Sequence, residues 1–376
     1  MRICVISEFS VPYYNGGGER RYYEMMKRVV KLGHEVDMIT MNYPNCKKHE
    51  QIDGINIHHI GPTIENPPIR SKTDFIKFFY SICKWLLKHD YDVLDAQSYS
   101  PLLPTTIMSK IKKTPLIGTV YDTSTNNKDQ WIQSSTLANR VEKFLVTLPF
   151  TKLLTVSNST KTSLINDFEV KGETIEILSI GFDTDFVDSI KCEEKNNNTI
   201  IFVGRLIPHK HVNHLLKVIN KLKNKIPDIK LVIVGKGIEK DNLIKYITDN
   251  YLEEHVEFLQ DLSNEELTYQ MKKSNVLVLP STREGFGMVL AEANSCNIPV
   301  IAYKSGGVVE VINSGNTGYL IEPENVEELT SKIELVLTNK KLQEKLGKQG
   351  RKHVEKKFNW DKIVNQYIQL LENIVK

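Results

Sequence analysis

The chain has 376 residues, with 49 lysines and arginines against 46 aspartates and glutamates. This length exceeds what one hydrophobic core usually serves, so it predicts two domains. A hydrophobic share of 40% with 25% charged residues is typical of a globular protein, and no apolar run reaches the roughly 18 residues that would cross a membrane. The net charge of +3, without a dense basic stripe, disfavours nucleic-acid binding. Five scattered cysteines without paired spacing indicate no structural zinc site and favour a reducing cytoplasm.

Short β-branched runs alternate with helical patterns through the first half of the chain. The amino-terminal run MRICVISEF reads as a first strand and not as a signal peptide. In chain order, the predicted strands of this half are 3–7, 35–40, 55–60, 93–96, 116–120, 153–157 and 175–178, with helical patterns that include 19–32 and 73–89. Alternation of this kind is typical of parallel sheets covered by helices on both faces.

The same alternation returns in the second half. Its predicted strands are 199–204, 230–235, 256–260, 276–280, 299–303 and 318–322. Its predicted helices are 209–225, 239–249, 263–273, 287–296, 306–313 and 325–338. Two such α/β blocks predict two doubly wound domains, whose ligands bind outside the carboxyl ends of the strands.

A polar segment, CEEKNNNT (192–199), lies between the two blocks and is the best candidate for a linker. We therefore expect an N-terminal Rossmann-like domain over residues 1–190 and a C-terminal one over residues 191–357. The chain ends in an amphipathic stretch, 358–376, which needs an apolar surface to pack on. If the two domains face each other, their post-strand loops can close on one cleft.

The segment LPSTREGFGMVLAEA (279–293) is the strongest candidate for a binding site. Gly285 and Gly287 open its helix, where glycines let backbone N–H groups approach an anion and the helix dipole favours negative charge. Glu284 stands in the loop, and Glu292 lies inside the helix, where it is placed to accept hydrogen bonds from ribose hydroxyls. The alternative is an ordinary loop with a solvated glutamate on each side.

Two further segments also follow strands. VGRLIPHK (203–210) places Arg205 and Lys210 just before a helix. These cations suit a diphosphate, because arginine binds it bidentately and lysine acts as a point charge, whereas exposed turns are the alternative. NGGGER (15–20) stands between the first strand and the first helix, where a glycine triplet either cradles phosphate or makes a tight turn.

Together these segments resemble the retaining glycosyltransferases of family 4, over nearly the whole chain. EGFGMVLAE matches the family's motif of two glutamates separated by seven residues, VGRLIPHK matches its G-R-L-x-x-x-K segment, and PYYNGGGE matches its glycine loop. The resemblance implies the GT-B fold: an acceptor-side domain and a nucleotide-sugar-binding domain facing a central cleft, with the helix at 358–376 packing back on the first domain. It also implies transfer from a UDP- or GDP-sugar to a glycan, lipid-linked or small-molecule acceptor, with retention of the anomeric configuration.

The resemblance further implies roles for individual residues. Arg205 and Lys210 would neutralise the donor diphosphate as it leaves, and Glu284 would contact the donor sugar. The other donor-binding residues would be Gly16, Gly17, the backbone amides of Gly285, Phe286 and Gly287, and Glu292 on the ribose. No metal or other cofactor is expected, because fixed cations and a helix N-terminus would meet the developing charge. The Asp-x-Asp of FDTDF (182–186) is accordingly interpreted as structural.

One position departs from the family pattern. Many members have a histidine after the strand at 116–120 that reaches the acceptor side of the donor sugar. Tyr121 stands in that place here and is followed by Asp122. A tyrosine can hydrogen-bond a sugar hydroxyl but carries no charge at neutral pH. Asp122 either orients the acceptor or caps a turn.

The helical segment 71–89 combines aromatic and aliphatic residues with Lys72, Lys77, Lys84 and Lys88. Basic amphipathic helices lie on membranes, which would suit a lipid-linked acceptor and a peripheral position on the cytoplasmic membrane face. The basic excess over residues 1–180, 22 cations against 19 anions, points slightly the same way. A helix that flanks a parallel sheet is apolar over a wide arc for ordinary core reasons, and the core interpretation is favoured.

Two alternatives to transfer stay open. Nucleotide-sugar 2-epimerases share the fold but would need different histidine and acidic loops in the first domain. A non-catalytic sugar-nucleotide-binding partner subunit is disfavoured by the presence of Arg205, Lys210, Glu284 and Glu292, whereas Tyr121 leaves it open.

Overall fold

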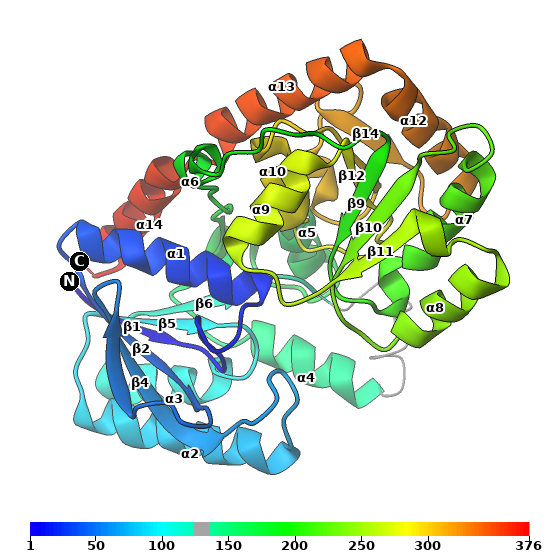
Figure 1. The fold of residues 1–376 in the computed structure, drawn as a ribbon. Coiled ribbons are helices and arrows are strands. Elements are labelled where there is room, and N and C mark those ends of the chain that lie inside the picture. The colour runs from blue at the N-terminus through cyan, green and yellow to red at the C-terminus, as the bar shows by residue number, and fades with distance from the viewer. Residues whose placement is uncertain (124–135, 376) are drawn as a thin grey trace. The chain divides into compact units, whose positions relative to one another are not determined.

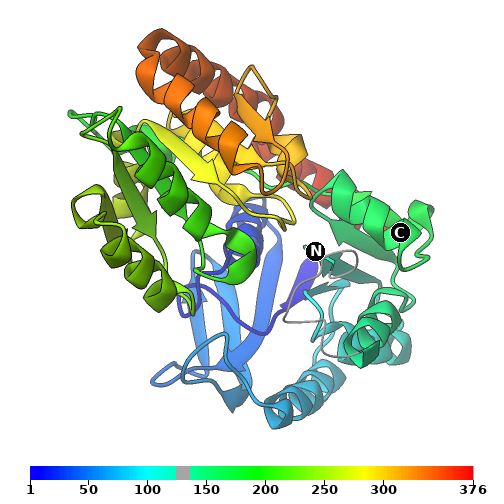
Figure 2. The same cartoon turned by 90° about the vertical axis from the view of Figure 1, so that its right-hand side faces the viewer.

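The computed structural model describes residues 1–123 and 136–375. The chain divides into two compact units. The first unit comprises Met1–Gly181 and Trp360–Lys376, and the second comprises Phe182–Asn359. Each unit is built on one sheet flanked by helices (Figures 1 and 2).

The first unit contains an eight-stranded sheet in the order β3-β4-β2-β1-β5-β6-β7-β8. Its strands are β1 (Arg2–Ile6), β2 (Glu35–Asn42), β3 (His49–Ile52), β4 (Ile55–Thr63), β5 (Val93–Gln97), β6 (Leu116–Val120), β7 (Lys152–Thr155) and β8 (Ile175–Ile177). The predicted parallel pairing is confirmed except at one edge, where β3 pairs antiparallel with β4. Because β2 lies on one side of β1 and β5 on the other, the strand order reverses at β1.

Helices cover both faces of this sheet. One core cluster joins it to α1 (Gly17–Lys31) and α14 (Trp360–Val375). The cluster on the opposite face includes residues of α2 (Lys72–Lys88), α3 (Leu102–Lys112), α4 (Thr136–Val146) and α5 (Asn158–Asn166). The expectation that the C-terminal helix packs on the first domain is confirmed, since Trp360, Ile363 and Tyr367 are buried in the core beside α1.

The second unit contains a six-stranded parallel sheet in the order β11-β10-β9-β12-β13-β14. Its strands are β9 (Thr199–Val203), β10 (Lys230–Val234), β11 (Val256–Leu259), β12 (Val276–Leu279), β13 (Val300–Tyr303) and β14 (Gly318–Ile321). Its α-helices are α6 (Thr184–Ser189), α7 (Val212–Leu222), α8 (Lys240–Asp249), α9 (Asn264–Lys273), α10 (Met288–Ser295), α11 (Val308–Val311), α12 (Val326–Thr338) and α13 (Lys340–Lys357). Three strands run outward from β9 on one side and three from β12 on the other, which is the strand order of a dinucleotide-binding fold.

The boundary between the units differs from the predicted one. The sequence placed it at 190/191, whereas the structure divides the chain at 181/182 and returns it to the first unit at 359/360. Helix α6 therefore belongs to the second unit. Arg351 on α13 makes a bidentate ion pair with Asp188 of α6 at 2.7 and 3.0 Å, which ties α6 to that unit.

Strand β3 and helix α13 are among the elements that were not predicted. Strand β3 is a half-exposed edge strand with the sequence HEQI, which lacks the apolar pattern of a buried strand. Half of the residues of helix α13 are lysine or glutamine, and the helix packs against α10 through small residues. A Cβ on Gly347 would lie 2.0 Å from the backbone oxygen of Asn297, so this contact depends on the missing side chain.

Helix α2 carries apolar side chains on both its inner and its outer face. Ser71 and Asp74 form a capping box at its start. Ile82 and its neighbours on the inner face are buried against the sheet, as the core interpretation predicted, while Ile76 on the outer face stays exposed. Among the residues that the structure describes, no helix is long and apolar enough to span a membrane.

We expect Ile82→Ala to lower the free energy of unfolding by about 2 to 5 kcal/mol, because it opens a cavity in the core. The matched change Ile76→Ala, on the exposed face of the same helix, should alter it by no more than about 0.5 kcal/mol. Urea denaturation of the two variants measures the difference. Equal effects would show that α2 is not anchored through Ile82.

Candidate functional site

The strand order of the second unit brings the two strongest sequence motifs together. Strands β9 and β12 pair side by side at the reversal of the sheet, although 72 residues separate Val203 from Val276. Because both strands are parallel, the loops after them leave the same edge of the sheet. One loop carries Arg205 and Lys210, and the other carries Glu284. Such a reversal is where doubly wound folds bind ligands.

Lys210 and Glu284 are in direct contact. The Lys210 ammonium donates a hydrogen bond to Glu284 Oε1, and the two side chains are only 13% and 14% exposed. The sequence predicted both residues for the site but did not predict this ion pair. Largely buried charges of opposite sign offset each other's desolvation, so without a ligand the pair holds both side chains in place.

Backbone and hydroxyl hydrogen bonds join the two loops. The Thr282 amide donates to the backbone oxygen of His209 at 2.9 Å. The Thr282 hydroxyl also lies 3.2 Å from His211 Nε2. Within the second loop, the Ser281 hydroxyl donates to the Arg283 oxygen at 2.8 Å. The motifs around Lys210 and Glu284 therefore form one rigid assembly.

A third loop, after β13, holds the backbone of Glu284 in place. The Gly307 amide donates to the backbone oxygen of Glu284 at 3.0 Å, and the Ser305 hydroxyl donates to the Ser281 oxygen at 2.7 Å. Gly306 has a φ of +48°, and a Cβ there would lie 1.9 Å from the Glu284 oxygen. Both its left-handed backbone and this close approach require glycine. The segment 305–312 (SGGVVEVI) therefore supports the backbone of Glu284.

Arg205 differs from Lys210 in being exposed. Its loop is tied to the loop after β10, because the Leu206 amide donates to the Lys236 oxygen at 2.8 Å and the Glu239 amide donates to the Leu206 oxygen at 3.0 Å. The backbone around Arg205 is therefore fixed while its guanidinium stays accessible to solvent. An accessible guanidinium and a fixed ammonium on one loop are suited to binding phosphate oxygens.

The glycine-rich start of α10 lies in the same assembly. Gly287 is the residue before the helix and has a φ of +83°, with no side-chain hydrogen bond capping the helix. The Phe286 ring is buried and packs 5.3 Å from the Phe358 ring, so only its backbone is available to a ligand. Gly285 is half-buried beside Glu284, and Glu292 lies half-buried on α10.

In the first unit, Gly16 and Gly17 lie at the start of α1, directly after the loop that follows β1. Gly16 is the residue before the helix, and no side chain caps it. The neighbouring Gly18 packs against the Tyr121 ring, since a Cβ there would lie 3.1 Å from Tyr121 Cε2. The structure thus brings the predicted glycine loop together with Tyr121, two features about 100 residues apart in the sequence.

Tyr121 is held by a buried polar network. Its hydroxyl donates to Gln97 Oε1 at 2.6 Å, and Gln97 Nε2 donates to Asp95 Oδ1 at 2.6 Å. Tyr367 on the C-terminal helix donates to Asp95 Oδ2 at 2.7 Å. The Arg21 guanidinium of α1 lies 5.6 Å from the centre of the Tyr121 ring. Residues of α1, α14 and β5 together therefore fix the orientation of the Tyr121 side chain.

Burial dominates the ionisation of this network. It raises the pKa of Asp95 from 3.8 to about 6, even though hydrogen bonds from Tyr367, Thr119 and Gln97 and the charge of Arg21 act in the opposite direction. Burial likewise raises the pKa of Tyr121, so its hydroxyl stays protonated at neutral pH.

Asp122 and the Asp-x-Asp motif have local structural partners. Asp122 Oδ1 accepts the Thr123 amide at 2.9 Å, which is the turn-capping alternative. Asp183 caps α6 by accepting the Phe186 amide at 2.9 Å, in agreement with the structural interpretation of FDTDF. Within residues 1–123 and 136–375, no group of three or more His, Cys, Asp or Glu side chains is arranged to hold a metal ion.

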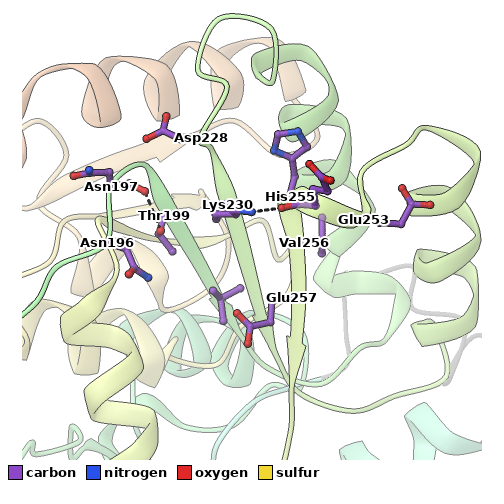
Figure 3. Close-up of a pocket in the computed structure, with 11 residues that line it drawn as sticks. Asn196, Asn197, Thr199, Asp228, Lys230, Glu253, His255, Val256 and Glu257 are labelled. Atoms are coloured by element: carbon purple, nitrogen blue, oxygen red, sulfur yellow. Dashed lines mark hydrogen bonds between the residues drawn. The ribbon is translucent and has the colours of Figure 1, made fainter.

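Two cavities lie elsewhere in the second unit. One, of about 520 Å³, opens at the amino ends of β9, β10 and β11, where Thr199, Lys230 and Val256 begin the strands (Figure 3). It is at the opposite edge of the sheet from Lys210 and Glu284, so it is not the ligand site of a doubly wound fold. The other, of about 350 Å³, includes Leu259 and Leu262 after β11.

Sequence inspection missed Arg21, Asp95, Gln97 and Tyr367. Two of them left a signal, because Asp95 and Gln97 are polar residues in a strand that is buried along its whole length. Buried polar side chains need partners, which marks such a strand as part of a polar network. Nothing in the apolar face of α14 distinguishes Tyr367 from an ordinary core residue.

The chain is similar to known glycosyltransferases. Residues 15–186 match the family described as Glycosyltransferase Family 4, and residues 184–353 match the family described as Glycosyl transferases group 1. An uncharacterized glycosyltransferase of Methanocaldococcus jannaschii, MJ1607, is 25% identical over 383 residues, which cover 98% of this chain and 97% of that protein.

Solved structures have the same fold. Sucrose-phosphate synthase from Thermosynechococcus elongatus matches with a TM-score of 0.87 at 21% identity, over 99% of this chain and 98% of that one. Anabaena Alr3699/HepE, solved in complex with UDP-glucose, matches with a TM-score of 0.80 at 19% identity, over 99% of this chain and 100% of that one. The expected GT-B fold is thereby confirmed, and these matches give no support to the epimerase alternative.

The raised pKa of Asp95 predicts a specific dependence of stability on pH. The folded chain binds the Asp95 proton more tightly than the unfolded chain does, so this residue's contribution is most favourable near pH 4 and is lost as the pH rises to about 6. A shift of about two units corresponds to roughly 3 kcal/mol. We expect the stability of Asp95→Asn relative to the wild type to rise by about this amount between pH 4 and pH 7.

Urea denaturation of both proteins across that range measures the effect. Thr155→Val, which alters another buried polar side chain outside the network, is the control and should show a difference that does not vary with pH. A difference between Asp95→Asn and the wild type that is equally constant would contradict the raised pKa.

Proposed function

We propose, since this chain belongs to the glycosyltransferases of family 4, that it transfers a sugar from a UDP- or GDP-sugar to a glycan, lipid-linked or small-molecule acceptor, with retention and without a metal. The observation that carries the proposal is the contact between Lys210 and Glu284 at the reversal of the second sheet, with Arg205 on the same loop as Lys210. Two cations and one carboxylate there fit the two parts of such a donor, its diphosphate and its sugar.

Lys210 and Glu284 change partners when the donor binds. The diphosphate carries more negative charge than one carboxylate, so it competes for the Lys210 ammonium. Glu284 is then available to accept hydrogen bonds from the sugar hydroxyls. The exposed Arg205 binds the diphosphate bidentately, and the backbone amides of Gly285, Phe286 and Gly287 lie beside Glu284 to add further donors. Glu292 holds the ribose.

In the reaction, the bond between the anomeric carbon and the diphosphate oxygen breaks, and a bond to the acceptor oxygen forms on the same face of the sugar. The acceptor proton passes to the departing diphosphate. Arg205 and Lys210 stabilise the negative charge that grows on the leaving group, which is a task that fixed cations perform without reorganisation. In the first unit, Gly16 and Gly17 bind phosphate oxygens, and the oriented Tyr121 hydrogen-bonds a hydroxyl on the acceptor side.

The nucleotide base binds near Leu259 and Leu262, at the carboxyl end of β11. The 350 Å³ cavity at these residues supports this placement. The UDP-glucose bound by the Anabaena relative makes UDP-glucose the first donor to test. The five cysteines are all free, which agrees with a cytoplasmic enzyme.

We expect turnover of a UDP- or GDP-sugar to be unaffected by EDTA, because Arg205 and Lys210 take the place of a metal. A panel of UDP- and GDP-sugars is first screened for thermal stabilisation, where a donor at 100 times its Kd should add about 2.7 kcal/mol. Hydrolysis or transfer is then measured with the selected donor. Loss of activity on chelation that manganese or magnesium restores would contradict the metal-free mechanism, and no stabilisation by any nucleotide sugar would contradict the donor class.

Glu284 and Glu292 should respond differently to mutation. Glu292 contacts the ribose in the ground state and the transition state alike, so Glu292→Gln should mainly raise the donor KM. Glu284 contacts the sugar while its bond to phosphate breaks, so Glu284→Gln should lower kcat by about 100-fold or more with bare UDP or GDP still bound. Calorimetry with nucleotide and with intact donor separates the two effects. A Glu284→Gln variant with normal kcat but weakened nucleotide binding would overturn this division of roles.

A further inference from the structure

The outer faces of α2 and α3 carry an unusual concentration of exposed apolar side chains. Of the 18 large hydrophobic residues exposed in the described part of the chain, seven lie between residues 69 and 111. Six of them lie on α2 and α3, namely Phe75, Ile76, Tyr80, Leu87, Ile107 and Ile111, and Ile69 lies just before α2. Ile76, Tyr80 and Leu87 are 70%, 68% and 57% exposed, and Ile111 is 59% exposed. Single exposed hydrophobics are ordinary, whereas a contiguous group marks an interaction surface.

These residues look outward on one side of the first unit. Helices α2 and α3 contact each other and bury their inner residues in the same core cluster, on the same face of the sheet (Figure 1). Their outer faces therefore point the same way. On α2, Ile76, Tyr80 and Leu87 follow the spacing i, i+4, i+11, which places them along one stripe of the helix. We call the outer surface of α2 and α3 the α2/α3 face.

The same surface is strongly basic. The two helices contain six lysines and one aspartate, a net charge of +5, whereas the whole chain has a net charge of +3. Lys72, Lys77, Lys84 and Lys88 are exposed on α2, and Lys110 is exposed on α3. In the described part of the chain, Lys84 and Lys88 form no ion pair or hydrogen bond. The inner face of each helix supplies its residues to the core. Packing of the core therefore does not account for the apolar side chains on the outer face.

We propose that the α2/α3 face docks this protein on an anionic lipid bilayer. Lysines interspersed with apolar side chains are what a helix needs to lie in a bilayer interface, where the lysines meet anionic headgroups and the apolar side chains enter the acyl boundary. Tyr80 is of a type enriched at that depth. The proposal concerns binding alone and does not depend on the proposed transfer reaction.

A second copy of this chain fits the face less well. A symmetric dimer would place the same lysines of both copies against each other, and like charges repel. The apolar side chains also stand on the convex outer surfaces of two helices, which a bilayer covers without a shape-matched pocket. Charge and shape together therefore favour a lipid surface as the partner.

The test is cosedimentation of the full chain with vesicles of phosphatidylcholine, with and without phosphatidylglycerol. The wild type should bind only the vesicles that contain phosphatidylglycerol, and the binding should weaken as salt increases. The triple variant Lys77→Glu/Lys84→Glu/Lys88→Glu should lose roughly a hundredfold or more in affinity, at about fivefold for each lysine removed. The variant Ile76→Ser/Tyr80→Ser/Leu87→Ser should also lose binding, which charge attraction alone does not predict.

Helix α13 supplies a matched control. Lys341, Lys345 and Lys348 are exposed on it, but no large hydrophobic residue of α13 is exposed. Lys341→Glu/Lys345→Glu/Lys348→Glu should therefore keep vesicle binding within about twofold of the wild type, as no interface contact is lost. Every altered residue is exposed, and an unchanged Tm would verify that each variant folds.

Three results would overturn the proposal. They are equal binding to neutral vesicles, an equal loss in the α13 control, and absence of vesicle binding. In the last case, sedimentation velocity on the wild type and the α2 variants shows whether the α2/α3 face is instead an interface between two copies.

Discussion

The candidate site depends on the reversal of strand order between β9 and β12. Parallel neighbours end at the same edge of a sheet, so this one topological feature places the loop of Lys210 against the loop of Glu284. The remaining contacts of the site build on it. The loops after β10 and β13 contact these two loops through backbone hydrogen bonds. Because Gly306 has no side chain, the loop after β13 can approach the Glu284 backbone closely. A ligand at this site would therefore meet loops that are already assembled, and little binding energy would be needed to order them.

In the first unit, the main energetic cost is the burial of a carboxylate. Asp95 is fully buried in the middle of a central strand, where three side-chain donors and the charge of Arg21 offset part of the desolvation cost. The C-terminal helix supplies one of these donors, Tyr367, from the far end of the chain. Packing of α14 on the first unit thus contributes to a polar network as well as to the core. Through Gln97, the network sets the orientation of Tyr121, the residue at which the chain departs from its family.

Helix α2 shows that one helix can satisfy two demands. Its inner face contributes Phe78, Ile82 and Leu86 to the core, which is enough to fix it against the sheet. Its outer apolar side chains are not needed for that task. The apolar residues of this segment lie on both faces of the helix. The sequence pattern shows the periodicity of these residues but not which face packs on the sheet, so it cannot separate the two faces.

The sequence by itself determined the fold class, the two-block organisation, nearly every strand of both sheets and the family. Strand periods and glycine-rich turns are local signals, and the motifs around Arg205, Lys210, Glu284 and Glu292 stand in unbroken segments. Only the tertiary structure decided which of these residues touch. The ion pair of Lys210 with Glu284, the support of Glu284 by Gly306, and the hydrogen bond of Tyr367 to Asp95 join residues 74, 22 and 272 positions apart. Such contacts follow from strand order and helix packing, which no local pattern encodes. For the same reason, the first unit ends at Gly181 and not at residue 190 as predicted. A long-range ion pair between Arg351 and Asp188 ties α6 to the second unit.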